Sequence, residues 1–125
     1  LAGSMLGSGG VTVTEEGTDM VWAALRLMEF FYHESCGKCS PCREGSSWLV
    51  QIMRRIVNKR GQMADLETLT DLCKNIAGRT VCAFGDAEVS PILSTLKHWR
   101  HEYVAMIHAA EAANLIRPEP AGAKH

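Results

Sequence analysis

The sequence contains no apolar run that approaches the roughly 20 residues needed to span a lipid bilayer. Its N-terminus also lacks the charged start and apolar core of a secretory signal peptide. Neither sign of charge is in excess, because 13 Lys and Arg against 14 Asp and Glu leave a net charge of -1. Binding a phosphate backbone needs a concentrated basic surface. These absences predict a soluble domain with no membrane span and no nucleic-acid partner.

Motifs of nucleotide binding and nucleophilic catalysis are absent as well. The glycines of GSMLGSGG form neither GxGxxG nor GxxxxGK[ST], and we interpret them as turns. No arrangement of Ser, His and Asp argues for a catalytic nucleophile. The chain starts at Leu1 in this Gly-rich stretch, without an initiator Met, so we expect it to be a fragment of a larger protein.

What is present suits one domain. The chain has 125 residues, of which 46% are hydrophobic, enough for a modest core. Residues 1–18 read as the end of a preceding domain or a linker, with Val11 to Val13 alternating like a short edge strand. Helical patterns fill residues 19–117, and residues 118–125 read as a disordered tail. The expected fold is mainly α: a small four-helix bundle with a short Gly-rich and β segment at its start.

Capping residues mark the first two helices. Asp19 is the expected N-cap of a helix that ends near His33, and Ser40 followed by Pro41 predicts the start of a second helix, which Gly61 ends. The apolar positions expected to face the core are Met20, Ala24, Leu27, Met28 and Phe31, then Trp48, Leu49, Ile52 and Ile56.

The third helix is expected over residues 64–76, with Gly78 as its left-handed C-terminal residue. Ser90 and Pro91 repeat the Ser-Pro pattern and predict the start of the last helix. The apolar positions at helical spacing are Leu66, Leu69, Leu72, Cys73 and Ile76, then Ile92, Leu96, Trp99, Tyr103, Met106 and Ala110.

The cysteines carry the functional signal. Their number is odd, and Cys36, Cys39 and Cys42 fall within seven residues, in ESCGKCSPCREG. This layout is poor for a disulfide framework and typical of a metal centre in a reducing compartment. A tight turn can aim three such thiolates at one centre. Gly37 allows backbone conformations that a side chain forbids.

The fourth ligand must come from elsewhere in the chain. Cys82 is the natural candidate, because Gly78 and Gly85 mark its surroundings as a loop between the third and fourth helices. Four thiolates suit a [4Fe–4S] cluster. Cys73 could replace Cys82, but it falls on an apolar helical stripe and is interpreted as a core residue.

A thiolate-bound cluster is anionic and needs positive potential around it. If Pro41 is the first helical residue, the free N–H groups and the dipole of that helix point toward the cluster. Lys38 and Arg43 flank the ligands and are candidates to add charge or hydrogen bonds to sulfur.

Zinc is the competing metal, although its usual four-thiolate layout is two separated CxxC pairs. The bacterial ferredoxin motif fails, since it needs a further Cys where Ser46 and Ser47 stand. His33 precedes Cys36 by three residues and could tune the site, but a helix-end role is favoured. Trp48 and Trp99 are interpreted as core, and a surface face is expected for His98, His101 and His108.

ESCGKCSPCREG, GRTVCAFGDAEVSPI and LKHWRHEY together resemble the C-terminal part of the NADH-oxidising 51 kDa-type flavoprotein subunit of respiratory complex I, the family of F subunits of NADH-quinone oxidoreductase. The resemblance covers nearly everything except the tail. In that family the clustered cysteines and the later one bind a [4Fe–4S] cluster, which implies Cys36, Cys39, Cys42 and Cys82 as ligands and leaves Cys73 unassigned.

The resemblance also implies a role and a setting. FMN and NAD(H) would bind upstream of Leu1, and this domain would relay electrons from the flavin to other iron–sulfur subunits of the same complex. The fragment alone would not be catalytic. Its expected place is the cytoplasmic side of the bacterial inner membrane or the mitochondrial matrix. Ala83, Phe84 and AEVSPI depart from the commoner family pattern, which leaves a diaphorase subunit of an NAD-linked hydrogenase or formate dehydrogenase as an alternative.

Overall fold

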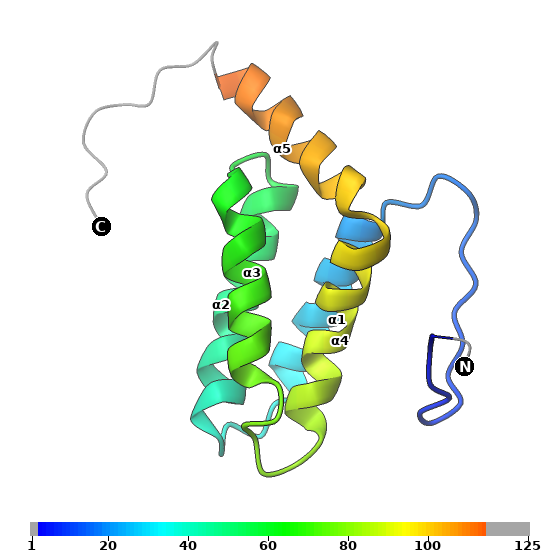
Figure 1. The fold of residues 1–125 in the computed structure, drawn as a ribbon, viewed down its shortest axis with the longest axis vertical. Coiled ribbons are helices and arrows are strands. Elements are labelled where there is room, and N and C mark those ends of the chain that lie inside the picture. The colour runs from blue at the N-terminus through cyan, green and yellow to red at the C-terminus, as the bar shows by residue number, and fades with distance from the viewer. Residues whose placement is uncertain (1–2, 115–125) are drawn as a thin grey trace.

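The computed structural model describes residues 3–114, with side chains for residues 3–113, so the tail expected over residues 118–125 lies outside the described residues. Five helices follow one another: α1 (Met20–Glu34), α2 (Ser40–Val57), α3 (Met63–Ile76), α4 (Phe84–His98) and α5 (Arg100–Asn114) (Figure 1). No strand forms within residues 3–114, so the expected strand at Val11 to Val13 is wrong. The two valines are 81% and 90% exposed, with no neighbouring strand to pair with. The mainly α fold class is confirmed, with five helices rather than four.

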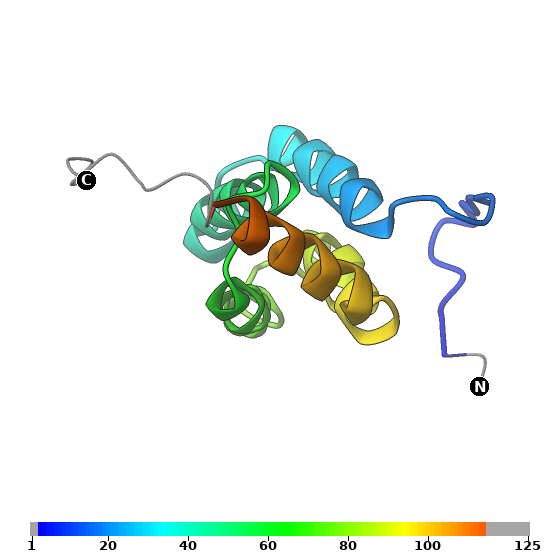
Figure 2. The same ribbon diagram turned by 90° about the horizontal axis from the view of Figure 1, so that it is seen from above.

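Helices α1 to α4 form a ring in which each helix packs against the next, and α4 packs back against α1. Successive helices run in opposite directions, and α5 lies across one end of the ring (Figures 1 and 2). The α1–α2 and α3–α4 connections therefore lie together at the end opposite α5. The described helices include none that is both long and apolar enough to cross a membrane.

Helix α1 begins where its capping residue predicts. The Oδ1 of Asp19 accepts hydrogen bonds from the N–H groups of Val21 and Trp22, at 2.9 and 3.0 Å. The buried face is rotated from the expected one, because Val21 and Leu25 are buried whereas Leu27 is 49% exposed. The N-cap signal is local, but the face that a helix buries depends on where its neighbours pack.

Helix α2 begins one residue earlier than expected. Cys39 occupies the N-cap, Ser40 is the first helical residue, and no side chain caps the helix start. Trp48 was expected in the core but is 52% exposed. Beyond α3, Gly78 adopts the expected left-handed backbone, with φ of 70°.

The start expected at Ser90 is wrong, because α4 already begins at Phe84 and Pro91 lies inside it. The turns before the proline are held by packing, since Gly85 and Val89 are both buried. The prediction of one continuous last helix is also wrong, because α4 ends before Trp99, its C-cap, and α5 begins at Arg100. Trp99 was expected in the core but is 36% exposed. Tertiary contacts thus outweigh the local Ser-Pro signal.

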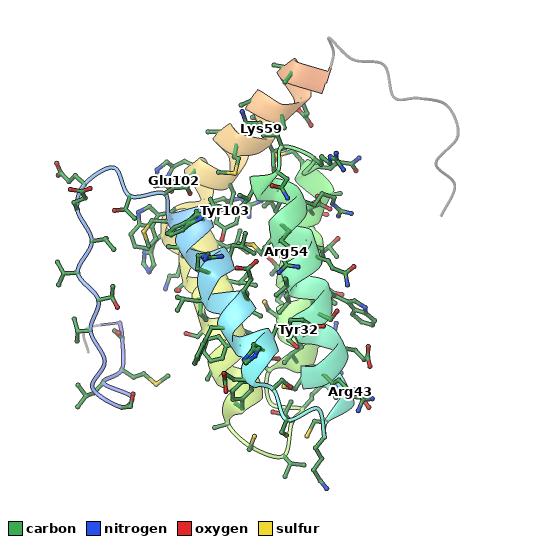
Figure 3. All side chains as sticks on the ribbon, turned by 180° about the vertical axis from the view of Figure 1, so that it is seen from behind. Tyr32, Arg43, Arg54, Lys59, Glu102 and Tyr103 are labelled. Atoms are coloured by element: carbon green, nitrogen blue, oxygen red, sulfur yellow. The ribbon has the colours of Figure 1, made fainter. Side chains whose placement is uncertain are left out.

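The core runs through the ring and ends under α5. Its fully buried larger side chains include Met28, Leu49, Met53, Ile56, Leu66, Leu69, Ile76, Ile92, Tyr103 and Ile107. The Tyr103 hydroxyl bonds the Oγ1 of Thr95 at 2.8 Å, and Glu102 accepts a hydrogen bond from the N–H of Met20 at 2.9 Å. Figure 3 shows Glu102 and Tyr103 at this end and Arg43 at the other. Helix α5 is therefore anchored to both α4 and α1.

Candidate metal centre

The α1–α2 and α3–α4 connections lie together at the end opposite α5 (Figure 1). They border a partly open hollow of about 180 Å³. Its wall is formed by Glu34, Cys36, Lys38, Cys39, Cys42, Thr80, Cys82, Phe84 and Gly85. Four of the five cysteines in the chain thus line one space, three from the first connection and the start of α2, and one from the second connection. Topology explains this, because alternating helix directions return the chain to the same end after every second helix.

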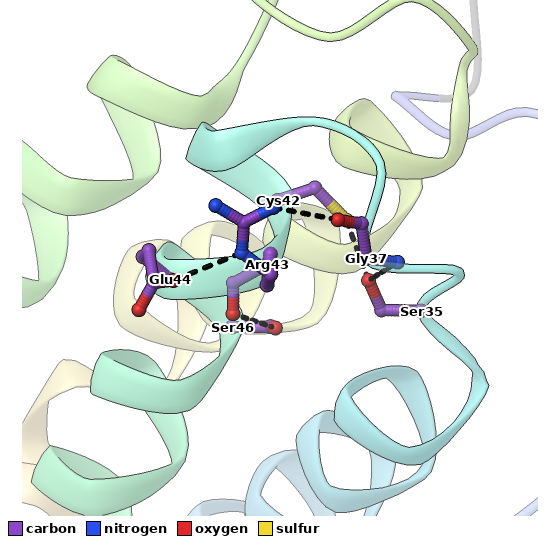
Figure 4. A network of polar contacts seen from close by, with 6 residues as sticks. All are labelled: Ser35, Gly37, Cys42, Arg43, Glu44 and Ser46. Carbon is purple, nitrogen blue, oxygen red and sulfur yellow. Dashed lines mark hydrogen bonds and ion pairs between the residues drawn. The ribbon is translucent and has the colours of Figure 1, made fainter.

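The first connection is held in shape by its own backbone. Gly37 has a φ of 75°, a left-handed conformation that glycine adopts at no steric cost. Its carbonyl accepts a hydrogen bond from the Nη1 of Arg43 at 2.7 Å, which ties the loop to the first turn of α2 (Figure 4). The turn therefore presents Cys36 and Cys39 beside Cys42.

The second connection is fixed by polar contacts around Cys82. The Thr80 hydroxyl donates to the Cys82 carbonyl at 2.8 Å, and the N–H of Gly78 donates to Asp86 at 2.8 Å. A Cβ on Gly85 would lie 2.4 Å from the Oγ1 of Thr80, so only glycine allows α4 to approach the loop this closely. Cys82 itself is exposed.

One contact joins the two connections directly. The N–H of Val81 donates to the Sγ of Cys39 at 3.5 Å. This places the backbone beside Cys82 against a cysteine from the other loop.

Cys42 differs from the other three cysteines because its side chain is buried, at 7% exposure. Its Sγ lies 3.2 Å from the Ser35 hydroxyl and 3.4 Å from the Oε2 of Glu88. Burial raises the pKa of the Cys42 thiol, and Ser35 opposes that rise. Burial also raises the pKa of Glu88 to about 7.

Glu88 is fully buried, and its Oε1 has no hydrogen-bond partner among the described residues. Sequence reasoning missed both Glu88 and Ser35. Because the last helix is expected to start at Ser90, Glu88 falls before the predicted helix, where helical spacing is not considered. Extending that helix backward would have placed Glu88 on the same face as Ile92, which is a signal for burial.

Cys73 does not line the hollow. It is fully enclosed in the core, and this burial raises its pKa to about 12. The interpretation of Cys73 as a core residue is therefore confirmed.

The basic residues and histidines considered from the sequence differ in their distance from the hollow and in their contacts. Lys38 is exposed and lines the hollow, while Arg43 bonds the Gly37 carbonyl and Glu44 rather than a sulfur. His33 is exposed and pairs with Glu34 at 2.9 Å. The expected surface positions are confirmed for His98, His101 and His108.

The side chains of residues 3–113 include no group of three His, Cys, Asp or Glu that converges tightly enough to hold one metal ion. The four cysteines are instead arranged around a space.

Comparison with known proteins gives consistent matches. Residues 22–106 match the family described as the NADH-ubiquinone oxidoreductase-F iron-sulfur binding region. The NADH-quinone oxidoreductase F subunit numbered 2 of Rhizobium meliloti is 55% identical over 106 residues, covering 85% of this chain and 25% of that protein. The corresponding F subunit of Streptomyces coelicolor is 53% identical over 102 residues, covering 82% of this chain and 23% of that protein. The chain thus spans about a quarter of the length of these relatives.

Solved structures share the fold. The NAD+-reducing [NiFe]-hydrogenase in its H2-reduced state matches with a TM-score of 0.73 at 24% identity, covering 86% of this chain and 21% of that one. The air-oxidised state of an NAD+-reducing [NiFe]-hydrogenase matches with a TM-score of 0.72 at 26% identity, covering 82% of this chain and 20% of that one.

Proposed function

Because the chain belongs to the NADH-ubiquinone oxidoreductase-F iron–sulfur binding region family, we propose that it is an electron relay built around one [4Fe–4S] cluster. The proposed ligands are Cys36, Cys39, Cys42 and Cys82. A cluster held by four thiolates accepts and releases single electrons, with a potential set by its charge, its hydrogen bonds and its exposure.

One observation carries this proposal: four thiol side chains from two separate connections line a single hollow of about 180 Å³. Thiols arranged around a space suit a multi-atom group, whereas zinc would need its ligands drawn to one point at about 2.3 Å. Cys73, the fifth cysteine, lies outside this set in the core.

The surroundings can balance the negative charge of such a group. Helix α2 starts at the hollow with Cys39 as its N-cap, and no side chain occupies its free N–H groups. These groups and the helix dipole supply positive potential there. Lys38 adds a cation to the wall of the hollow, but Glu34 on the same wall offsets it, so the start of α2 is the main source of positive potential. Arg43 contributes indirectly by holding the Gly37 turn.

The names of the relatives support a proposal for the wider activity of the parent protein. Those relatives are named as subunits of NADH-quinone oxidoreductase. We therefore assign FMN and NAD(H) to the part of the parent subunit outside this chain. Electrons would pass from reduced flavin through this domain, residues 19–117, to iron–sulfur clusters in partner subunits. The setting would be the cytoplasmic face of the bacterial inner membrane or the mitochondrial matrix.

A diaphorase subunit of an NAD-linked hydrogenase is the second candidate, supported by the shared fold with NAD+-reducing [NiFe]-hydrogenase. The identity to those structures, 24% and 26%, is about half of the 55% and 53% to the two NADH-quinone oxidoreductase relatives. The first candidate is therefore favoured. Both assign the same cluster chemistry to this domain.

Anaerobic reconstitution of the chain with iron and sulfide tests the cluster directly. We expect a brown protein with four iron atoms per chain, as the [4Fe–4S] assignment requires, and an EPR signal on reduction. Serine replacement of Cys36, Cys39, Cys42 or Cys82 should remove most of the bound iron, whereas Cys73→Ser, the matched control, should retain it. A colourless, EPR-silent protein that binds zinc through the same cysteines would instead identify a structural zinc module.

A further inference from the structure

Ser35 occupies a fixed position beside the hollow. It is the C-cap of α1, and its backbone N–H donates to the carbonyl of Phe31 at 3.0 Å. Its side chain points toward the start of α2, where the hydroxyl lies 3.2 Å from the Sγ of Cys42 (Figure 4). In residues 3–113, no other side-chain hydroxyl has a hydrogen bond to a cysteine sulfur.

Either atom can donate in this contact, and the surrounding contacts favour the Ser35 hydroxyl as the donor. The N–H of Gly37 donates to the Oγ of Ser35 at 3.4 Å, so this oxygen already accepts a hydrogen bond. The hydroxyl proton of Ser35 is then free to point at Cys42. Arg43 reinforces this arrangement by holding the Gly37 carbonyl.

Metal ligation makes the direction of the bond obligatory. In the metal-free chain the thiol of Cys42 has its own proton, and it can donate to the Oε2 of Glu88 at 3.4 Å. A thiolate that ligates iron has no proton and can only accept. A hydrogen bond between Ser35 and the ligated sulfur must therefore use the hydroxyl proton of Ser35.

The buried position of Cys42 increases the effect of such a bond. Cys36 and Cys82 are exposed, so water can solvate their sulfurs, whereas Cys42 is 7% exposed. Water therefore cannot readily replace a lost donor at Cys42. Hydrogen bonds also count for more in a low-dielectric environment.

We propose that Ser35 is a positioning residue that raises the reduction potential of the cluster by donating a hydrogen bond to the ligating sulfur of Cys42. The inference rests on the proposed cluster. Reduction adds one electron to the cluster and moves no proton, so the negative charge on its sulfurs grows. A donor to one of these sulfurs stabilises the reduced form more than the oxidised form.

The test is an EPR-monitored redox titration of the reconstituted chain and three serine variants. Ser35→Ala removes the donor and should shift the midpoint potential to a lower value. Ser35→Thr retains a hydroxyl and should leave the midpoint close to that of the unmodified chain. Ser94→Ala is the matched control, because the Ser94 hydroxyl is exposed and bonds the Pro91 carbonyl on α4. It should not move the midpoint.

A second measurement follows the proton itself. Pulsed EPR of the reduced cluster in D2O should detect a coupled deuteron that is present in the unmodified chain and in Ser35→Thr but missing from Ser35→Ala. A merely structural role for the serine would not predict this pattern.

The outcomes separate the two proposals. If the unmodified chain forms no cluster, the proposed function fails and this inference fails with it. If the cluster forms but Ser35→Ala has an unchanged midpoint, only this inference is overturned. If Ser35→Ala and Ser35→Thr lose iron to the same extent, the inference is also overturned, because the hydroxyl then has no specific role. Iron loss from Ser35→Ala alone supports a hydroxyl bond to the ligand.

Discussion

The two ends of the helical ring are built in different ways. At the α5 end, apolar side chains close the core, and Tyr103, Ile107 and Ala110 are fully buried. At the other end the loops border a hollow of about 180 Å³, and Cys36 and Cys82 are exposed. Backbone and side-chain hydrogen bonds shape these loops, and an edge-to-face contact between Phe31 and Phe84 supports the start of α4 beside them. The α5 end is therefore closed by apolar side chains, whereas the loop end leaves a space lined by cysteines. We expect the two ends to respond independently to substitution.

The largest effect is expected from Tyr103→Ala, at the α5 end. Removing this buried aromatic ring should lower the free energy of unfolding by about 3 to 5 kcal/mol, in denaturant unfolding of the metal-free chain. Tyr103→Phe removes only the hydroxyl that meets Thr95 and should cost about 1 kcal/mol. Both variants should still bind iron where they are folded. Folded Tyr103→Phe without iron would contradict the independence of the two ends.

A smaller loss of stability, but with a loss of bound iron, is expected from Gly85→Ala at the hollow. The new Cβ would lie 2.4 Å from the Oγ1 of Thr80, so α4 or the Cys82 loop must shift. Overpacking of this kind costs about 1 to 3 kcal/mol. Iron content after reconstitution should fall as well, because a shift of Thr80 would also displace Cys82, whose carbonyl Thr80 binds. Gly10→Ala, with nothing within 4 Å of its Cβ, is the control and should change neither quantity.

The smallest effect is expected between the two ends, at Glu29. Its carboxylate joins α1 to α2 by accepting from Arg54 at 2.9 Å, and it also pairs with Arg26 at 2.8 Å. The hydrogen bond from Arg54 lowers the pKa of Glu29 from its ordinary value of 4.5. Glu29→Gln should therefore cost less than about 1 kcal/mol at pH 7.

The pH dependence supplies the check on Glu29. A carboxyl whose pKa is lower in the folded chain stabilises it above pH 4.5, and this contribution is lost as the pH falls through the folded-state pKa. The difference in unfolding free energy between the unmodified chain and Glu29→Gln should shrink to zero over that range. A difference that is constant with pH would mean that charge is not its source.

Local signals predicted much of the fold and the membership of the candidate site. The capping carboxylate of Asp19 and the left-handed Gly78 act within a few residues, so their roles are readable from sequence. The spacing of Cys36, Cys39 and Cys42 is equally local. Cys82 was identified from its loop context, and the structure places it on the same hollow. That these four bind a cluster stays a prediction.

The features that were missed depend on contacts between helices. Pro91 locally predicts a helix start, but buried contacts of the residues before it let α4 begin earlier, at Phe84. Trp48 has helical spacing with core residues yet lies at the edge of the buried face, so half of its surface is exposed. Glu88 meets Cys42 because α4 contacts α2 across the interior of the ring. A single sequence does not specify how neighbouring helices are rotated against each other.

Because the helix directions alternate, Cys42 and Cys82 lie at the same end of the ring only when an even number of helices separates them. The chain leaves Cys42 along α2 and returns along α3 before it reaches Cys82, so two helices separate the loops. Lengthening both helices by the same number of turns would move the far end of the ring and leave the four sulfurs together. Inserting one extra spanning helix between them would send Cys82 to the α5 end. The lengths of the helices between the two loops can therefore change together without separating the four cysteines, but the number of those helices can change only in pairs.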